Sequence, residues 1–310
     1  MPAANTGVWY ALGAYVLWGL LPVYWKALQH VPAREILAHR ILWSFAFLAL
    51  LVRARGTWST LATSARSRRT LRLYSGAAVV LTINWLTYIW AVNTDRIVDT
   101  SLGYYINPLL SVCLGVAFFR ERLRPLQWCA VGLAAVSVVY LTVAHGSLPW
   151  VALVLAGSFG VYGLVKKLAP LGALHGLMIE TALLAPPALG YLTILGVRGD
   201  GAFGYGGAKT TLLLTTAGVV TALPLLLFAT AARRVSLTTM GILQYVSPTC
   251  GLLLGVAVYH EPFTRARQVA FGLIWVALLL YWLEGVWQGG AAAWSPRSRG
   301  QPAQRNPRDA

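Results

Sequence analysis

The chain has 310 residues, of which 57% are hydrophobic and 11% are charged, and its mean hydropathy is +0.63. This composition excludes an ordinary soluble globular domain and indicates an integral membrane protein whose main partner is the lipid bilayer. The formal net charge of +16 does not indicate nucleic-acid binding, because the 25 Lys and Arg residues cluster between apolar runs, as they do in membrane proteins.

Ten apolar segments are long enough to cross a bilayer as helices, at about 20 residues for each crossing. In chain order they are 7–26, 34–53, 73–93, 97–119, 125–144, 150–167, 175–197, 210–231, 237–259 and 269–288. The Arg-rich segment 54–72 and the Gly-rich segment 198–209 are predicted to be loops. The segment 289–310 is rich in Pro, Gly and Arg and has few hydrophobic residues, so we expect a disordered basic cytoplasmic tail.

Basic residues are distributed unevenly between the two sides of this predicted bundle. If the N-terminus is cytoplasmic, seventeen Lys and Arg residues lie in the inner loops and tail, and seven lie in the outer loops. Cytoplasmic segments carry the excess of Lys and Arg in membrane proteins. Both termini are therefore predicted to be cytoplasmic.

The segments 97–119 and 237–259 are related by a shift of 140 positions. The aligned pairs include Tyr105 and Tyr245, Pro108 and Pro248, and, just beyond the segments, Glu121 and Glu261. The chain is therefore interpreted as a duplication, with repeats at 1–144 and 145–288. Each repeat has five predicted helices, an odd number, so the second repeat would be inverted in the membrane. The predicted fold is an all-α polytopic membrane protein with ten transmembrane helices in two inverted five-helix repeats, an arrangement typical of secondary transporters.

The two aligned prolines mark a predicted site. A proline inside a helix kinks it and leaves the carbonyl four residues earlier without its usual donor, here at Tyr104 and Gln244. Such carbonyls need protein, water or ligand partners inside a bilayer. The predicted substrate-binding residues are Tyr104, Tyr105, Asn107, Gln244 and Tyr245, joined by Asn84, Trp85 and Tyr88 from 73–93. The aromatic residues of 73–93 have an alternative interpretation as part of an interfacial belt.

Charged and titratable residues inside the spans are a second set of candidates, because they are costly in lipid. His39, Arg40 and Glu180 are assigned to coupling or to the translocation path. The alternative is structural: Glu35 would pair with His39 and Arg40 near the outer surface, and Glu180 would pair with a basic group near the inner one. Glu261, like its counterpart in the first repeat, is predicted to cap a helix or to pair with Arg.

Other motifs point to packing and not to chemistry. Neither a catalytic constellation nor a metal-binding or cofactor-binding motif occurs in the sequence. Cys113, Cys129 and Cys250 lie within apolar runs, so free buried thiols are expected. Small residues spaced by four, at Ser111 with Gly115 and at Gly251 with Gly255, predict close helix packing, within one molecule or between copies in a homodimer.

Several pieces of the sequence resemble the RarD branch of the EamA-type transporters, in the drug/metabolite transporter superfamily. They are EILAHRILWSF (35–45), INWLTYIWAVN (83–93), SLGYYINPLLSVCLG (101–115), RERLRPLQW (120–128), IETALL (179–184) and LQYVSPT (243–249). The resemblance implies two EamA repeats, a bacterial inner-membrane location and export or exchange of small molecules. It also implies recurrent polar positions, here His39, Arg40, Asn84, Asn93, Tyr104, Asn107, Glu180, Gln244 and Tyr245.

The predicted function is secondary transport of a small metabolite or drug-like molecule, by alternating access through a central cavity and without a cofactor. The alternative is a non-transporting membrane scaffold or sensor that retains the transporter fold. A membrane enzyme is disfavoured because the sequence offers no catalytic constellation.

Overall fold

The computed structural model describes residues 3–65, 67–119, 123, 125–232, 234 and 243–289. These residues form helices and connecting segments, without a strand in any described range. The helices are α1 (Ala3–Lys26), α2 (Ala33–Ala54), α3 (Trp58–Ala65), α4 (Arg68–Asn93), α5 (Ile97–Phe119), α6 (Pro125–His145), α7 (Trp150–Leu168), α8 (Ala173–Arg198), α9 (Gly207–Ala232), α11 (Val246–Leu253), the π-helical turn η1 (Leu254–Val258) and α12 (Arg265–Gly289). The prediction of an all-α polytopic membrane protein is confirmed.

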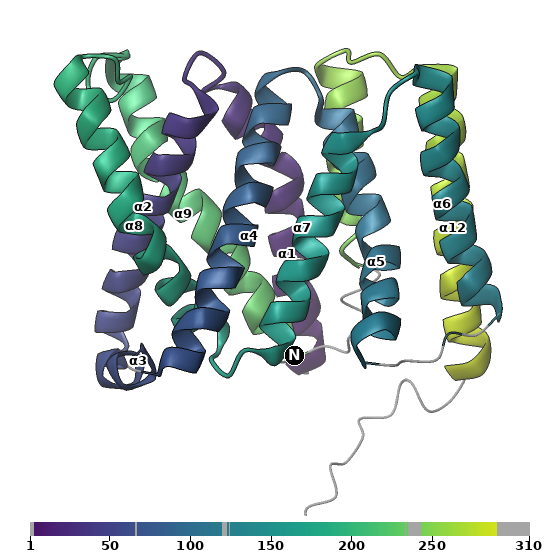
Figure 1. Ribbon diagram of the computed structural model, residues 1–310, viewed down its shortest axis with the longest axis horizontal. Helices are drawn as coiled ribbons and strands as arrows, with labels where there is room; N and C mark the ends of the chain where they lie inside the picture. The colour runs from purple at the N-terminus through teal and green to yellow at the C-terminus, as the bar shows by residue number, and fades with distance from the viewer. Residues whose placement is uncertain are drawn as a thin grey trace, which may run out of the picture.

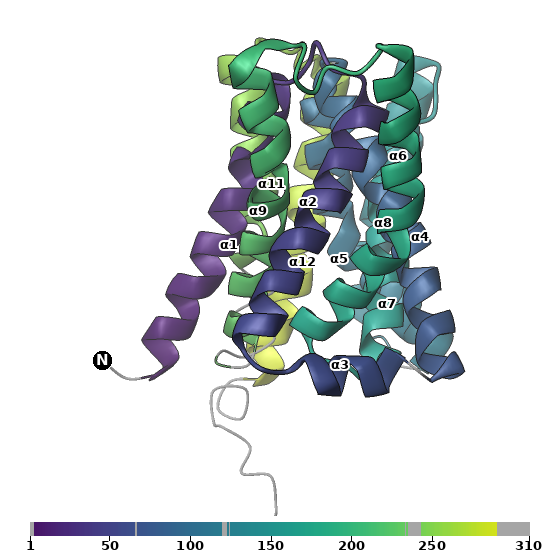
Figure 2. The ribbon, with the colours of Figure 1, turned by 90° about the vertical axis from the view of Figure 1, so that its left-hand side faces the viewer.

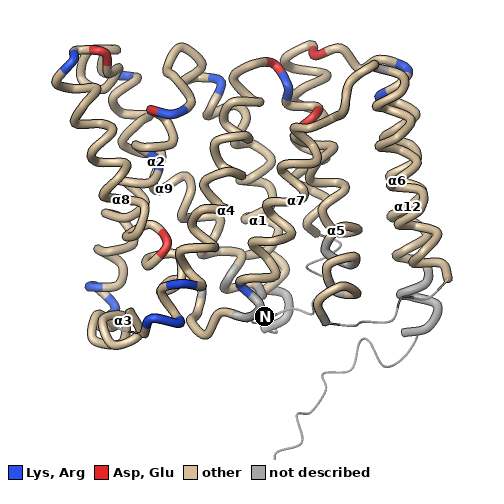
Figure 3. Tube along the Cα trace, in the orientation of Figure 1, with Lys and Arg blue, Asp and Glu red and all other residues tan. Residues whose placement is uncertain are grey.

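Seven helices in the described part of the chain are long and apolar enough to cross a membrane: α1, α2, α4, α6, α8, α9 and α12. Described stretches of α7 and of α11 with η1 form shorter apolar helices. Charged residues gather mostly at the two ends of the bundle (Figure 3). This distribution fits an apolar slab between two aqueous surfaces, while the count of ten crossings stays a prediction.

The helices run side by side along one common direction (Figure 1). Helices α8, α2 and α9 lie at one edge, α4, α1 and α7 fill the middle, and α6 packs against α12 at the opposite edge. The N-terminal end of α1 and the short helix α3 lie at the same end of the bundle (Figure 2). Helix α1 packs against α9 and α11, and α7 packs against α4 and α5.

The prediction that 54–72 is a loop was wrong, because this segment contains α3 and the first turn of α4. Leu61 of α3 is 7% exposed and joins the main hydrophobic core. The hydroxyl of Ser67 accepts a hydrogen bond from the Thr70 backbone N–H at 3.4 Å, which caps α4. The arginine-rich composition of this segment suggested a loop, but part of it forms a short helix at one end of the bundle (Figure 2).

The predicted continuous helix over 237–259 is also corrected. Residues 235–242 lie outside the described part of the chain, and a turn at Gln244 and Tyr245 precedes α11. The Gln244 carbonyl accepts a hydrogen bond from the Ser247 N–H at 3.3 Å, so it is not stranded by Pro248 as predicted. In contrast, α5 continues as a helix through Pro108.

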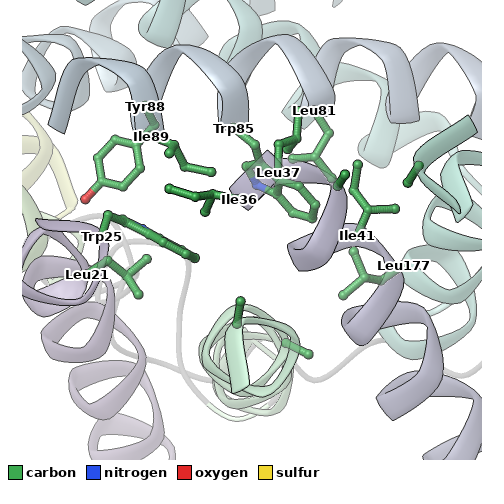
Figure 4. Close-up of a cluster of buried hydrophobic side chains, with 14 of the residues drawn as sticks. Leu21, Trp25, Ile36, Leu37, Ile41, Leu81, Trp85, Tyr88, Ile89 and Leu177 are labelled. Atoms are coloured by element: carbon green, nitrogen blue, oxygen red, sulfur yellow. The ribbon is translucent and has the colours of Figure 1, made fainter. Parts of the chain in front are cut away.

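Buried side chains divide the interior into two main clusters. One includes Trp25, Trp85 and Tyr88 and draws on helices α1, α2, α4, α8 and α9 (Figure 4). The other includes Tyr105 and Phe271 and draws on α5, α6, α11 and α12. Because α5 lies between them, neighbouring residues on α5 face different clusters.

Candidate functional site

A buried charged residue, Arg40 of α2, lies among aromatic side chains of other helices. Its guanidinium lies 4.1 Å from the ring centroid of Trp85 and 5.1 Å from that of Trp25. Tyr88 of α4 makes an edge contact with Tyr104 of α5 at 5.8 Å between centroids, and both tyrosines lie in the neighbourhood of Arg40. We call Trp25, Arg40, Trp85, Tyr88 and Tyr104 the Arg40 cluster. Figure 4 shows three of its aromatic side chains, from α1 and α4, among Ile36 and Ile41 of α2.

Arg40 and its neighbours on α2 do not pair with one another. Arg40 is 4% exposed, and its Nε and Nη1 have no hydrogen-bond partner among the described residues. Glu35 instead accepts a hydrogen bond from the Ala202 backbone N–H at 2.7 Å, and His39 stacks on Phe203 at 4.8 Å. The segment between α8 and α9 therefore folds over this end of α2. Its residues contact Glu35 and His39, the two side chains that the sequence analysis had offered as partners of Arg40.

Glu180 of α8 pairs with a base, as the structural alternative predicted. Its carboxylate lies 2.6 Å from Nζ of Lys166 and accepts a hydrogen bond from the Tyr162 hydroxyl at 3.1 Å. The Glu180 side chain is fully buried, and that of Lys166 is 25% exposed. The ammonium also lies over the ring of Tyr74 at 5.1 Å. This group joins α4, α7 and α8.

The predicted amide candidates differ in their surroundings. Asn84 donates to the Leu155 carbonyl at 3.2 Å and to the Ser158 hydroxyl at 2.9 Å, so it joins α4 to α7. Asn107 is buried, and its Oδ1 has no partner in the described part of the chain. It lies beside Gly160 of α7. The Asn107 Oδ1 is therefore available to accept a hydrogen bond. The Asn84 Nδ2, in contrast, already donates its hydrogen bonds to α7.

Tyr105 and Tyr245 form a separate group from the Arg40 cluster. Their rings stack with centroids 6.0 Å apart and an interplanar angle of 15°. The Tyr105 hydroxyl lies 2.6 Å from that of Thr249, and its ring contacts Phe271 at 5.8 Å. The predicted substrate site is thus divided: Tyr104 faces Arg40, while Tyr105, Tyr245 and the neighbouring Gln244 belong to the α5–α11–α12 side.

Glu261 caps a helix, in agreement with its prediction. Its carboxylate accepts hydrogen bonds from the Ile97 and Val98 backbone N–H groups, at 2.7 and 2.9 Å, at the start of α5. Burial raises the pKa of Glu261, although these two donors oppose the shift. Glu121 lies outside the described residues.

The glycine pair of the second repeat packs within the molecule. A Cβ on Gly251 would lie 2.8 Å from Ser101 Oγ, and one on Gly255 would lie 3.0 Å from a Val98 methyl group of α5. These contacts agree with the interpretation of helix packing. The side chains at Ser111 and Gly115 lie outside the described set.

Two residues of this region, Trp25 and Phe203, were not identified as candidates by the sequence analysis. Trp25 lies near a helix end, where tryptophans usually belong to the interfacial belt, but here it is fully buried against Arg40. Phe203 lies in a Gly-rich segment that was predicted to be only a loop. No local signal identifies either contact, because both depend on how separate elements pack.

An apolar pocket of about 370 Å³ lies away from the Arg40 cluster. It is lined by α2, α3, α4 and α8, with Phe45, Trp58 and Met178 among its residues. Arg40, Trp85 and Tyr88 of the Arg40 cluster are buried. Among the described residues, no group of three or more His, Cys, Asp or Glu side chains could hold a metal ion.

Comparisons with known proteins give a consistent result. Residues 5–143 match the EamA-like transporter family. The chain is 42% identical to Protein RarD of Escherichia coli over 91% of this chain and 95% of that protein. It is 48% identical to the Uncharacterized transporter YojE of Bacillus subtilis, over 89% and 93% of the two chains. The Chloramphenicol-sensitive protein RarD of Pseudomonas aeruginosa is 31% identical, over 90% and 94%.

The fold is also found in a protein of known crystal structure. That structure aligns with a TM-score of 0.58 and 21% identity, and covers 90% of this chain and 98% of that one. At this identity the likeness concerns the fold alone.

Proposed function

Because the chain belongs to the RarD-like proteins of the EamA-like transporter family, we propose that it is a secondary transporter of small organic molecules. It works in the bacterial inner membrane, with both termini cytoplasmic, and exports or exchanges its substrate. The observation that carries this proposal is the Arg40 cluster, a charged and aromatic group held between helices at a place where a membrane protein otherwise needs apolar side chains.

The helix contacts support alternating access. Under the predicted repeat, α1 corresponds to α7, α4 to α9, and α5 to α11. The contact between α1 and α9 then has its counterpart in the contact between α7 and α4. In the same way, the contact between α5 and α7 has its counterpart in the contact between α11 and α1. Two halves related in this way can rock against each other and open a common site to either side in turn.

The proposed substrate site extends from the Arg40 cluster toward α7. Tyr104 contacts Phe159 edge-on at 6.2 Å, and Asn107 lies beside Gly160. These contacts join the first predicted half of the chain to the second. Aromatic faces bind flat apolar groups, and the free Asn107 oxygen accepts a hydrogen bond from a polar one. The burial of Arg40 and Asn107 fits a conformation in which the site is shut.

The test is transport by the purified protein in lipid vesicles. Vesicles with the wild-type protein, with Trp85→Ala and with Trp128→Ala are incubated with a bacterial metabolite extract supplemented with chloramphenicol. Their contents are then compared with those of empty vesicles by mass spectrometry. Trp128 is 54% exposed on α6 and is the matched control.

We expect at least one compound to accumulate in wild-type and Trp128→Ala vesicles. Its uptake should fall about fivefold in Trp85→Ala, the equivalent of about 1 kcal/mol for a lost aromatic contact. If no compound accumulates above the level in empty vesicles, transport is refuted and the scaffold or sensor alternative is favoured.

A further inference from the structure

We propose that Arg40 binds the negatively charged group of the transported molecule, and that the substrates are small organic anions with an aromatic or apolar body. This inference rests on the proposed transport function. It adds the charge of the substrate and the residue that recognises it.

Within the described part of the chain, Arg40 differs from the other buried charged residues in lacking an ion-pair or hydrogen-bond partner. The described residues include five buried charged side chains, which are Lys26, Glu35, Arg40, Glu180 and Glu261. Lys26 pairs with Asp95, Glu180 pairs with Lys166, and Glu35 and Glu261 accept backbone N–H bonds. Arg40 forms neither an ion pair nor a hydrogen bond through Nε or Nη1 within the described ranges.

An unpaired buried guanidinium points to a missing anion. Arginine stays charged in proteins and presents five N–H donors, and an uncompensated buried charge is strongly destabilising. Arg40 is 4% exposed, and its Nε and Nη1 donors have no acceptor among the described residues. Its charge and its donors therefore lack a partner. A carboxylate or phosphate group would supply both the opposite charge and two acceptor oxygens.

The two tryptophans hold the charge without using its donors. Trp85 and Trp25 contact the guanidinium through their ring faces, at 4.1 and 5.1 Å. Cation–π attraction lowers the cost of burying the charge but forms no hydrogen bond with the N–H groups. The donors of Arg40 thus remain available for a forked contact with an oxyanion.

The surroundings define the rest of the ligand. Tyr88 and Tyr104 lie close enough to interact with the Arg40 charge, and their hydroxyl groups are further donors for an oxyanion. The rings of Trp25, Trp85 and the two tyrosines form an apolar wall suited to an aromatic body. A neutral molecule would leave Arg40 unpaired, and a cation would be repelled.

The test uses probes of matched shape and different charge. Purified wild-type protein, Arg40→Gln, Arg40→Lys and Arg34→Gln are melted in detergent with benzoate, benzamide or benzylamine, and with 3-phenylpropionate or its amide. Sodium acetate at the same concentration controls for salt. Arg34 lies on the same helix and is exposed, so Arg34→Gln is the matched control.

We expect one or both aromatic anions to stabilise the wild type and Arg34→Gln, and the amides and benzylamine to have no such effect. Binding should be at least tenfold weaker in Arg40→Gln, because charge-assisted hydrogen bonds are lost, and intermediate in Arg40→Lys, which keeps the charge without the fork. The proposal is overturned if neither anion stabilises the wild type, or if benzylamine does so equally. It is also overturned if Arg40→Gln binds the anions as the wild type does.

If Arg40→Gln does not fold, the charge preference of the wild type and the behaviour of Arg40→Lys still test the role of Arg40. The vesicle assay separates this inference from the proposed function. In the vesicle assay, accumulation of a neutral or cationic compound that persists in Arg40→Gln would refute the role of Arg40 while leaving transport intact. Accumulation of nothing in wild-type vesicles would refute transport itself.

Discussion

Replacement of Lys166 by methionine should destabilise the protein more than replacement of both Lys166 and Glu180. The Glu180 side chain is fully buried and its carboxylate lies 2.6 Å from Lys166 Nζ, whose side chain is 25% exposed. Lys166→Met keeps an apolar stem but leaves Glu180 as an uncompensated charge, which costs about 3 kcal/mol. The double variant Lys166→Met with Glu180→Gln removes both charges and should recover most of this loss.

The assay for this pair is the apparent melting temperature in detergent of the wild type, the two single variants and the double variant. A loss of about 3 kcal/mol corresponds to a decrease of about 5 °C in a chain of this size. The pair does not stabilise the buried charge if Lys166→Met has the melting temperature of the wild type. The same conclusion follows if the decrease in the double variant equals the sum of the decreases in the two single variants. A stable double variant that no longer transports would assign Glu180 to the translocation path, whereas one that transports normally would make the pair structural.

Other expectations concern packing, capping and topology. Gly218→Ala should cost about 1–3 kcal/mol, because its methyl group would overlap the backbone of α2, whereas Gly272→Ala has open space and serves as the melting control. Glu261→Gln should lower the melting temperature by weakening the cap on α5; an unchanged value would contradict that role. In a variant without the native cysteines, Tyr205→Cys should react with an impermeant thiol reagent on intact cells and Arg55→Cys should not; the reverse pattern would invert the predicted topology.

Much of the helical organisation was determined by the sequence alone. The predicted segment 34–53 became α2 at Ala33–Ala54, and 125–144 became α6 at Pro125–His145. Long apolar runs bounded by polar residues are sufficient for this, because every backbone group in lipid must find its partner within the helix. Two predictions were corrected: arginine-rich 54–72 contains α3, and a turn at Gln244 and Tyr245 interrupts 237–259.

Only the tertiary structure decided which side chains meet. The sequence identified Arg40, Trp85, Tyr88 and Tyr104 as unusual for a bilayer interior. It did not reveal that Trp25 covers Arg40 from another helix. Nor did it show that Tyr104 and Tyr105, adjacent in the chain, face different clusters. Successive residues of a helix point about 100° apart, so their partners depend on which helix packs on each face. Those contacts join residues distant in the chain, and no local pattern encodes them.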